Sequence, residues 1–353
     1  MRVVFRVEGE PNIGLGHIMR CMALAQSLVK HGHVVFFFMS QRSQHFCHNR
    51  TDWQGKILAI PETIVDIDKN AEPEWLTKQC SELRADWLVV DGYQFDMVYR
   101  QSLQSNVFKL AIFDDMNNSG ALYADMVING ALNAALHRYQ LTAPKASLAI
   151  GQGYQVLRQE FLQLTNKKWA DRNSLTLMFG GSDPNNLTLL ALQSLQNVNA
   201  AEPVNMPITV ITGAAYGRLH DLADLINSSG LDITHLHDCQ HMAAVLVTTK
   251  LALSAAGGSQ FELLACATPS ILVVVAENQK LASQDAENQG WCPVVNNDDL
   301  SVDELVMYCL SLWQQPNLLL TMHQKALLYP AVDGAKNIVA LMSEQKLTSG
   351  SVQ

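Results

Sequence analysis

The sequence has few charged residues and no excess of positive charge. Only 16% of its 353 residues are charged, and 24 Lys and Arg against 33 Asp and Glu give a formal net charge of −9. Binding to nucleic acid relies on dense basic clusters, which the sequence lacks, so we expect no nucleic-acid partner. The negative charge also opposes a phosphate-bearing ligand, which would therefore need local backbone amides and helix ends to hold it.

Long apolar runs and paired cysteines are missing as well. No run approaches the roughly 18 apolar residues of a membrane-spanning helix, and the first residues read as a strand rather than as a signal segment. We therefore expect no stable insertion into a membrane. The seven cysteines are odd in number, scattered, and never in C-x-x-C spacing, which is typical of reduced thiols in a cytoplasmic protein.

What the sequence contains is a repeated alternation of short apolar runs with amphipathic stretches. Such a pattern predicts parallel sheets covered by helices on both faces, and the length suits two domains of about 150 residues. We predict an α/β protein with two Rossmann-like domains facing a cleft. The expected parts are a first domain (1–150), a linker region (151–172), a second domain (173–325), and a C-terminal helix that crosses back, with its tail (326–353). The strands are predicted at residues 3–7, 34–39, 57–60, 87–90, 107–113, 174–179, 208–212, 233–236, 251–254 and 270–275. The last long helix is predicted at about 322–342.

Three polar clusters follow strands of the first domain. Gly14, Gly16 and His17 stand between a strand and a helix, and two further clusters are Asp91-Gly92-Tyr93 and Asp114-Asp115. Ligands of parallel sheets bind at the carboxyl ends of the strands, so these clusters are expected on one rim. The turn with Gly14 and Gly16 either binds an anion, with His17 at its mouth, or is a tight turn in which His17 caps the helix. The two aspartates either bind a metal or cap the turn that follows.

Two glycine-rich turns follow strands of the second domain, Gly180-Gly181-Ser182 and Gly257-Gly258-Ser259. Backbone amides and a serine hydroxyl at two such turns suit a diphosphate, whereas the alternative is close packing of helix on sheet. The sequence has no G-x-x-x-x-G-K-[ST] and no G-x-G-x-x-G, so hydrolysis of nucleoside triphosphates and hydride transfer lose support.

Other polar side chains lie near these turns. Glu262 is one helical turn beyond Gly258 and can accept hydrogen bonds from ribose hydroxyls, or it is a solvated surface residue. Asn278 and Gln279 follow an apolar strand and would face the cleft, although asparagine also favours turns. The alternating histidines and cysteine between His235 and His241 suggest a metal site, but His241 leaves the strand face that the others share, so no metal is expected.

Taken in order, these motifs resemble the UDP-sugar hydrolases of pseudaminic acid biosynthesis over nearly the whole chain. More distantly, the sequence is similar to the UDP-GlcNAc transferase that makes lipid II, and this similarity implies a GT-B fold. The resemblance is carried by Arg6, Gly14-Leu15-Gly16-His17, Met19-Arg20-Cys21, Leu24-Ala25, Asp114-Asp115, Tyr154, Arg158-Gln159-Glu160-Phe161, Phe179-Gly180-Gly181-Ser182-Asp183, Asn186-Leu187-Thr188 and Ala276-Glu277-Asn278-Gln279.

This resemblance implies hydrolysis of UDP-2,4-diacetamido-2,4,6-trideoxy-β-L-altropyranose to UDP and the free sugar, without a cofactor. His17 would orient and deprotonate the attacking water. The groups on the sugar side would be Gly14, Gly16, Arg20, Tyr93, Asn278 and Gln279. The groups at the diphosphate would be Gly180, Gly181, Ser182, Gly257, Gly258 and Ser259. Cys239 would lie at the uracil, and Glu262 at the ribose.

One departure and two other functions accompany this expectation. The family commonly has Arg-x-Asp after its first strand, whereas this chain has Arg6-Val7-Glu8, and the longer carboxylate predicts altered contacts to the sugar. The first alternative function is a GT-B glycosyltransferase of surface polysaccharide synthesis, which would need an acceptor. The second is a nucleotide-sugar binding module without catalytic activity.

Overall fold

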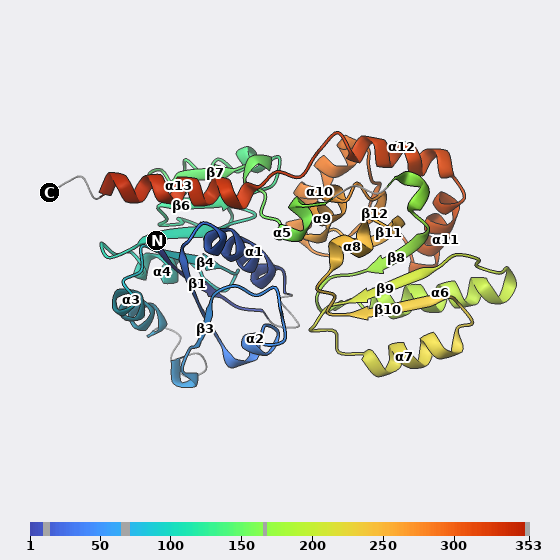
Figure 1. Cartoon of the computed structure of the whole chain (residues 1–353), viewed down its shortest axis with the longest axis horizontal. Helices are drawn as coiled ribbons and strands as arrows, with labels where there is room; N and C mark the ends of the chain where they lie inside the picture. The colour runs from blue at the N-terminus through green and yellow to red at the C-terminus, as the bar shows by residue number, and fades with distance from the viewer. Residues whose placement is uncertain (10–14, 65–70, 165–167, 350–353) are drawn as a thin grey trace. The chain divides into compact units, whose positions relative to one another are not determined.

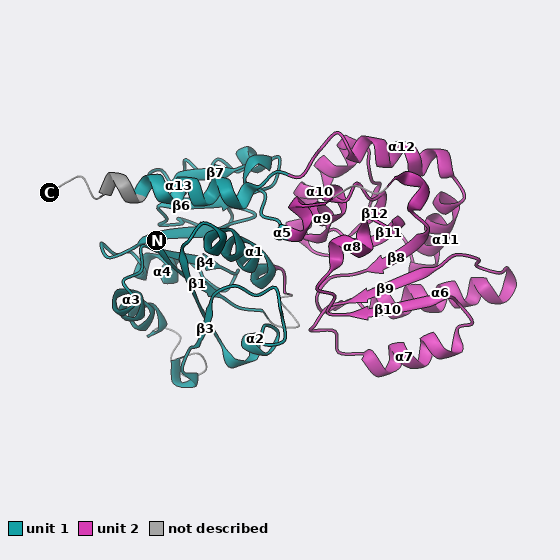
Figure 2. Ribbon diagram, in the orientation of Figure 1, with its two compact units in different colours: residues 1–10, 17–159, 332–353 teal, residues 11–16, 160–331 magenta. Residues whose placement is uncertain are grey.

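The structure, a computed structural model, describes residues 1–9, 15–64, 71–164 and 168–349. The chain forms two compact units, which Figures 1 and 2 show by element and by colour. The first unit takes residues 1–10, 17–159 and 332–353, and the second takes residues 11–16 and 160–331.

A parallel sheet forms the centre of the first unit. Its seven strands lie in the order β3-β2-β1-β4-β5-β6-β7, and every neighbouring pair is parallel. The strands are β1 (Arg2–Val7), β2 (Val34–Met39), β3 (Lys56–Ala59), β4 (Trp87–Asp91), β5 (Lys109–Phe113), β6 (Met126–Asn129) and β7 (Ser147–Ile150). Because β4 pairs with β1, the order reverses between these two strands, and such a point is where ligands bind in open α/β sheets.

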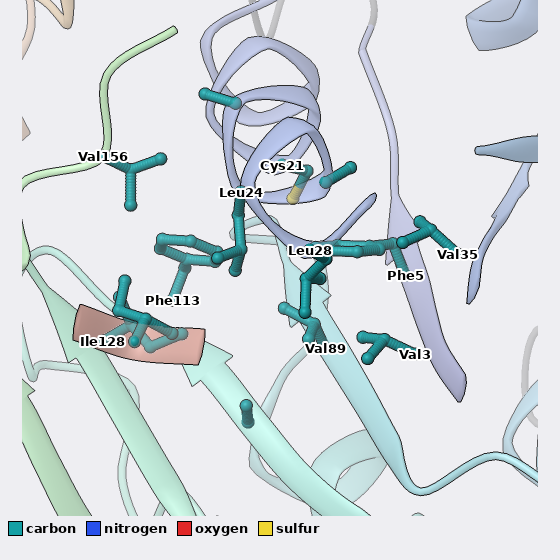
Figure 3. Packing of buried hydrophobic residues seen from close by; sticks show 14 of the residues in the cluster. Val3, Phe5, Cys21, Leu24, Leu28, Val35, Val89, Phe113, Ile128 and Val156 are labelled. Carbon is teal, nitrogen blue, oxygen red and sulfur yellow. The ribbon is translucent and has the colours of Figure 1, made fainter. Parts of the chain in front are cut away.

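Helices bury both faces of this sheet because its central strands are apolar on both sides. One face, shown in Figure 3, packs Val3, Phe5 and Val89 against Leu24 and Leu28. The other face of the sheet is packed against α3 and the residues near α4. The helices of the unit are α1 (Gly16–Lys30), α2 (Gln41–His45), α3 (Glu72–Glu82), α4 (Met97–Ser102) and α13 (Gly334–Ser349), with short 3-10 turns η2 (Ala134–His137) and η3 (Gln152–Tyr154).

The second unit repeats this arrangement with six parallel strands in the order β10-β9-β8-β11-β12-β13. The strands are β8 (Ser174–Met178), β9 (Ile208–Thr212), β10 (Ile233–His237), β11 (Thr249–Ala255), β12 (Ser270–Val274) and β13 (Val294–Asn296). The helices are α6 (Leu187–Ala201), α7 (Leu219–Ser228), α8 (Met242–Leu246), α9 (Ser259–Ala265), α10 (Glu277–Gln289), α11 (Val302–Trp313) and α12 (Pro316–Ala326), and η4 (Trp169–Asp171) is a 3-10 turn. The order reverses between β8 and β11, the strands that precede the two predicted glycine turns.

The C-terminal region differs from its prediction. Instead of one helix over 322–342, α12 ends at Ala326 and α13 begins at Gly334. Pro330 lies between them, and its missing amide hydrogen and fixed φ prevent a continuous helix. α13 then packs on the first unit, where Ile338 and Met342 are fully buried and the Trp87 indole N–H donates to the Met342 carbonyl at 3.2 Å.

The described residues of the segment predicted as a linker are divided between the two units, with 151–159 in the first and 160–164 and 168–172 in the second. Val156 belongs to the core of the first unit, and the Gln26 side chain accepts from the Gln159 backbone N–H at 3.0 Å. Just beyond, α5 (Gln159–Leu162) begins, and Glu160 accepts from the backbone N–H of Ala243 in the second unit at 3.2 Å. The chain therefore passes between the units over very few residues.

Candidate functional site

His17 lies in the first turn of α1 and faces Asp91, the last residue of β4. Both side chains are buried, with Asp91 fully inaccessible, and His17 Nδ1 is 2.7 Å from Asp91 Oδ1. Asp91 pairs in register with Val7 at the end of β1, so the two residues meet where the strand order reverses. The sequence prediction that polar groups converge at this rim is thus met by His17 and Asp91.

Arg20, one helical turn after His17, binds two carboxylates. Its Nε and Nη2 donate to Asp91, both at 2.6 Å, and its Nη1 donates to Asp115 at 2.7 Å. Burial raises the pKa of Asp91, but Arg20 and His17 overcome this effect and hold the pKa well below its usual range. The pKa of Asp115 is lowered as well, because Arg20 outweighs the effect of its burial. Arg20 thus binds within the protein, and a contact to a sugar stays a prediction.

Tyr93 completes this cluster. Its hydroxyl donates to Asp115 Oδ2 at 2.8 Å, and its ring meets the His17 ring edge to face with centroids 4.8 Å apart. About half of Tyr93 is exposed, and its contact to a sugar stays a prediction. We call His17, Arg20, Asp91, Tyr93 and Asp115 the histidine cluster.

The neighbouring Asp114 has a different role. Its Oδ1 accepts from the backbone N–H groups of Met116 and Asn117, at 3.2 and 2.6 Å, and from the Tyr139 hydroxyl at 2.8 Å. Asp114 therefore caps the turn after β5, as one of the two open alternatives predicted, while Asp115 faces Arg20. The two carboxylates point to different partners and do not form a paired metal site.

Glu8, the departure from the family pattern, is buried in a second polar network. Its carboxylate accepts from Arg6, from the Ser43 hydroxyl, and from the Ser40 hydroxyl at 2.7 Å. Ser40 is the N-cap of α2, so Glu8 ties the end of β1 to the start of that helix. The expected change in sugar contacts would therefore act through backbone placement rather than through a direct contact of Glu8.

The turn after β8 contains Gly180, Gly181 and Ser182, and it lies against the turn after β9. A Cβ on Gly213 would stand 2.5 Å from the Gly181 Cα, and the Gly181 carbonyl accepts from the Ala215 N–H at 3.1 Å. Gly180 has a φ of +86°, in the region that favours glycine, and is exposed. Close packing of the two turns and the positive φ of Gly180 both account for glycine here, and phosphate binding at this turn stays a prediction.

The amides that begin α6 already have an anionic partner. Asp183 Oδ1 accepts from the Leu187 N–H at 2.9 Å, and Oδ2 accepts from the Thr188 N–H at 2.8 Å. These amides are therefore not free for a phosphate. Any diphosphate at this turn would have to use the backbone amides and the serine hydroxyl of the glycine turn itself, and this role stays a prediction.

The turn after β11 holds Gly257, Gly258 and Ser259, next to the start of α10. Gly258 is exposed, and a Cβ there would meet nothing within 4 Å. Gln279 Oε1 accepts from the Val275 N–H at 2.9 Å, so the side-chain oxygen of Gln279 stabilises the turn between β12 and α10. Glu262 and Asn278 are half-buried, in α9 and α10 respectively. The predicted UDP and amide residues thus follow neighbouring strands of one sheet.

Two histidines of the alternating segment share one hydrogen-bond partner. His235 Nε2 and His237 Nδ1 lie 2.8 and 3.1 Å from the same Thr212 hydroxyl, and Cys239 follows the strand half-buried. Nowhere in the described parts of the chain are three or more His, Cys, Asp and Glu side chains placed to hold a metal ion. None of the described helices combines the length and apolar character needed to cross a bilayer.

Some of the site was not predicted, and part of it lies outside the described residues. Gly14 is among residues 10–14, so its predicted role stays a prediction. Gly16 begins α1, and a Cβ there would meet nothing within 4 Å. Asp91 and Gly213 were not assigned a role from sequence. The signal for Asp91 was a carboxylate at the end of an otherwise apolar strand. The signal for Gly213 was a glycine directly after a strand, as in the two predicted glycine turns.

The two parallel-sheet units are those of a GT-B fold, which confirms the predicted fold class. Across 97% of this chain and 99% of the other, the structure superposes on MurG of Acinetobacter baumannii with a TM-score of 0.64 at 14% identity. The UDP complex of MnaA from S. aureus gives a TM-score of 0.65 at 10% identity, covering 96% of this chain and 94% of that one. At these identities the likeness concerns the fold.

Sequence comparisons add relatives. Residues 175–338 match the glycosyltransferase family 28 C-terminal domain. The chain is 24% identical over 341 residues to the spore coat polysaccharide biosynthesis protein SpsG of Bacillus subtilis, and the aligned residues cover 95% of each protein. It is 24% identical over 242 residues to UDP-2,4-diacetamido-2,4,6-trideoxy-beta-L-altropyranose hydrolase of Campylobacter jejuni, covering 67% of this chain and 79% of that protein. It is also 24% identical over 296 residues to an uncharacterized protein of Methanocaldococcus jannaschii. The aligned residues cover 81% of this chain but only 58% of that protein.

Proposed function

We propose that this protein is an enzyme that uses a UDP-sugar, and that it hydrolyses a UDP-activated 2,4-diacetamido-2,4,6-trideoxy sugar at the anomeric carbon. The observation that carries the proposal is the histidine cluster, in which a buried His17 meets Asp91 where the strand order reverses. The Campylobacter jejuni hydrolase supports the reaction type and the sugar class. The family 28 match and SpsG support a nucleotide-sugar substrate in polysaccharide synthesis.

The chemistry needs one base and a good leaving group. His17 removes a proton from a water molecule, whose oxygen bonds to the anomeric carbon from the face opposite UDP. The bond between that carbon and the β-phosphate oxygen breaks, and its electron pair leaves with UDP. The products are UDP and the free sugar with inverted configuration. Because UDP leaves readily, the protein mainly has to stabilise its charge.

In this proposal, the second unit holds the nucleotide. The glycine turns after β8 and β11 follow adjacent parallel strands, and such turns present amides to phosphate oxygens. Glu262 binds the ribose, and the backbone at Cys239 contacts the uracil. Tyr93 from the first unit and Asn278 from the second contact the sugar.

A glycosyltransferase of surface polysaccharide synthesis is the second candidate. The fold and the match to family 28 favour it, since a transferase would use the same nucleotide turns and the same base on an acceptor hydroxyl. The two functions differ in one requirement: a hydrolase releases UDP with water alone, whereas a transferase depends on an acceptor.

The test is UDP release from a panel of UDP-sugars without any acceptor, in water labelled with ¹⁸O. We expect release from a diacetamido-trideoxy sugar, with the label in the sugar. Label in UDP would exclude attack at the anomeric carbon, and release only after an acceptor is added would establish the transferase.

His17→Ala tests the base. We expect it to keep UDP binding and to lose turnover by a factor of about 10² to 10⁴, the usual contribution of a positioned base. The matched control is His220→Ala, since His220 is 88% exposed and paired only with the exposed Asp224 in the described contacts. Equal rates in His17→Ala and the parent would remove His17 from the mechanism.

A further inference from the structure

The buried Asp91 carboxylate is surrounded by donors. Its Oδ1 lies 2.7 Å from His17 Nδ1 and 2.6 Å from Arg20 Nη2, and its Oδ2 lies 2.6 Å from Arg20 Nε and 3.5 Å from Cys21 Sγ. A carboxylate with two contacts on each oxygen, one group being a permanently charged guanidinium, stays ionised. Asp91 can therefore only accept hydrogen bonds.

This arrangement decides which nitrogen of His17 carries the proton. Since Asp91 only accepts, the 2.7 Å contact requires a proton on His17 Nδ1. Arg20 Nη2 also lies 3.1 Å from His17 Nδ1, but both nitrogens then carry hydrogen, so this approach is that of two donors converging on Asp91 Oδ1. In the neutral imidazole the lone pair is left on Nε2.

We propose that Asp91 is a positioning residue, which fixes His17 in the tautomer with a free Nε2 so that this atom receives the proton of the attacking water. The part of this inference that concerns turnover rests on the proposed function. After proton transfer, the imidazolium faces the charge of Asp91 in a buried site, which stabilises it.

The rest of the histidine cluster supports this assignment. The Tyr93 ring packs edge to face on the imidazole and limits its rotation. Arg20 is held in turn by Asp115 and lies over the Phe113 ring, with its guanidinium carbon 4.9 Å from the centroid. Asp91 is thus the hydrogen-bond acceptor for His17 Nδ1, and Arg20 holds Asp91.

The first experiment does not depend on turnover. In uniformly ¹⁵N-labelled wild-type protein, two-bond and three-bond couplings between ring nitrogens and carbon-bound protons report the tautomer of each neutral histidine, and the His17 signals are identified by their loss in His17→Ala. We expect His17 to carry its proton on Nδ1. A proton on Nε2 in the wild type would overturn the proposal, and this result does not depend on the activity of any variant.

The second experiment compares variants of two buried carboxylates. Asp91→Asn keeps the shape of the side chain but offers an amide that can donate to Nδ1, and we expect kcat to fall by about 10²-fold or more with little change in KM. Glu72→Gln is the matched control, because Glu72 is buried and paired with Arg6 at 2.6 Å in the same unit, without contact to His17. We expect Glu72→Gln to keep both the tautomer and the turnover.

The outcomes separate the two proposals. A proton on Nδ1 in the wild type together with no release of UDP from any sugar would refute the proposed hydrolysis and leave the tautomer assignment standing. Parental kcat in a folded Asp91→Asn would refute the positioning role even if hydrolysis is confirmed. Partial recovery of kcat in Asp91→Glu, with the wild-type tautomer, would support positioning over a purely structural role.

Discussion

Adding a methyl group at Gly213 tests whether the glycine turns of the second unit serve packing, binding or both. In Gly213→Ala, the new Cβ would stand 2.5, 2.6 and 2.8 Å from the Cα, O and C atoms of Gly181. Carbon atoms in contact prefer separations of about 3.5 to 4.0 Å, so the two turns must move apart by about 1 Å. All three atoms are backbone, so no side-chain rotation can relieve the contact.

The expected magnitude follows from two opposing effects. Overpacking of this kind typically costs about 1 to 3 kcal/mol. Replacing glycine by alanine restricts the unfolded chain and returns about 0.4 to 1 kcal/mol, since φ at Gly213 is not positive. We therefore expect the free energy of unfolding to fall by about 1.3 kcal/mol, the difference between the mid-range values of about 2 and about 0.7 kcal/mol. A displaced Gly181 should also weaken UDP binding about tenfold or more, which is about 1.4 kcal/mol.

Urea unfolding and calorimetric titration with UDP measure these two effects on the same samples. Gly217→Ala is the control, because a Cβ on this nearby exposed glycine meets nothing within 4 Å and its φ is not positive either. We expect Gly217→Ala to bind UDP as the parent does. Parental stability and UDP affinity in Gly213→Ala would refute the packing argument, and lost stability with unchanged affinity would refute the placement of the diphosphate at this turn.

Two further predictions concern the first unit. Ile338→Ala should lower the free energy of unfolding by about 2 to 5 kcal/mol, because Ile338 is fully buried in the core formed with α1. The control Lys336→Ala, on the exposed side of α13, should change this free energy little. Equal urea midpoints for the two variants would contradict the packing of α13. Asp91 and Asp115 have lowered pKa values in the folded protein, so their stabilisation is complete above the unfolded pKa of about 4 and is lost as the pH falls toward the folded values. Urea midpoints of the parent should therefore drop more steeply below pH 4 than those of Asp91→Asn, and parallel curves would contradict this account.

The sequence predicted the central strands well because they are continuous apolar runs. It missed β6 and β7, the last two strands at one end of the first sheet. Each has four residues, and no amphipathic helix precedes either of them in the sequence. An apolar run of four residues is too short to show whether its hydrophobic periodicity is that of a strand or of a helix. The break between α12 and α13 did have a signal in Pro330, but apolar residues on both sides obscured it.

The candidate site shows a different limit. His17 and the glycine turns could be proposed from local pattern, but the partnership of His17 with Asp91 joins residues 74 positions apart. It exists because β4, rather than a strand closer in sequence, lies beside β1, and periodicity does not give strand order. Asp114 and Asp115 illustrate the same point, since adjacent carboxylates in sequence have separate partners. The roles of the individual site residues stay predictions until binding and turnover are measured.

The packing of α13 has a consequence for the order in which the chain folds. The first unit supplies the earliest strands to be synthesised, yet its core includes Ala335, Ile338, Val339 and Met342, which are made after the whole second unit. Nearly all of the second unit, by contrast, is one continuous stretch, residues 160–331. During synthesis the second unit can therefore complete its core first. The part of the first sheet's apolar face that α13 covers stays open until α13 is made, although α1 already packs on the same face. That exposed face is where aggregation of the newly made chain should begin.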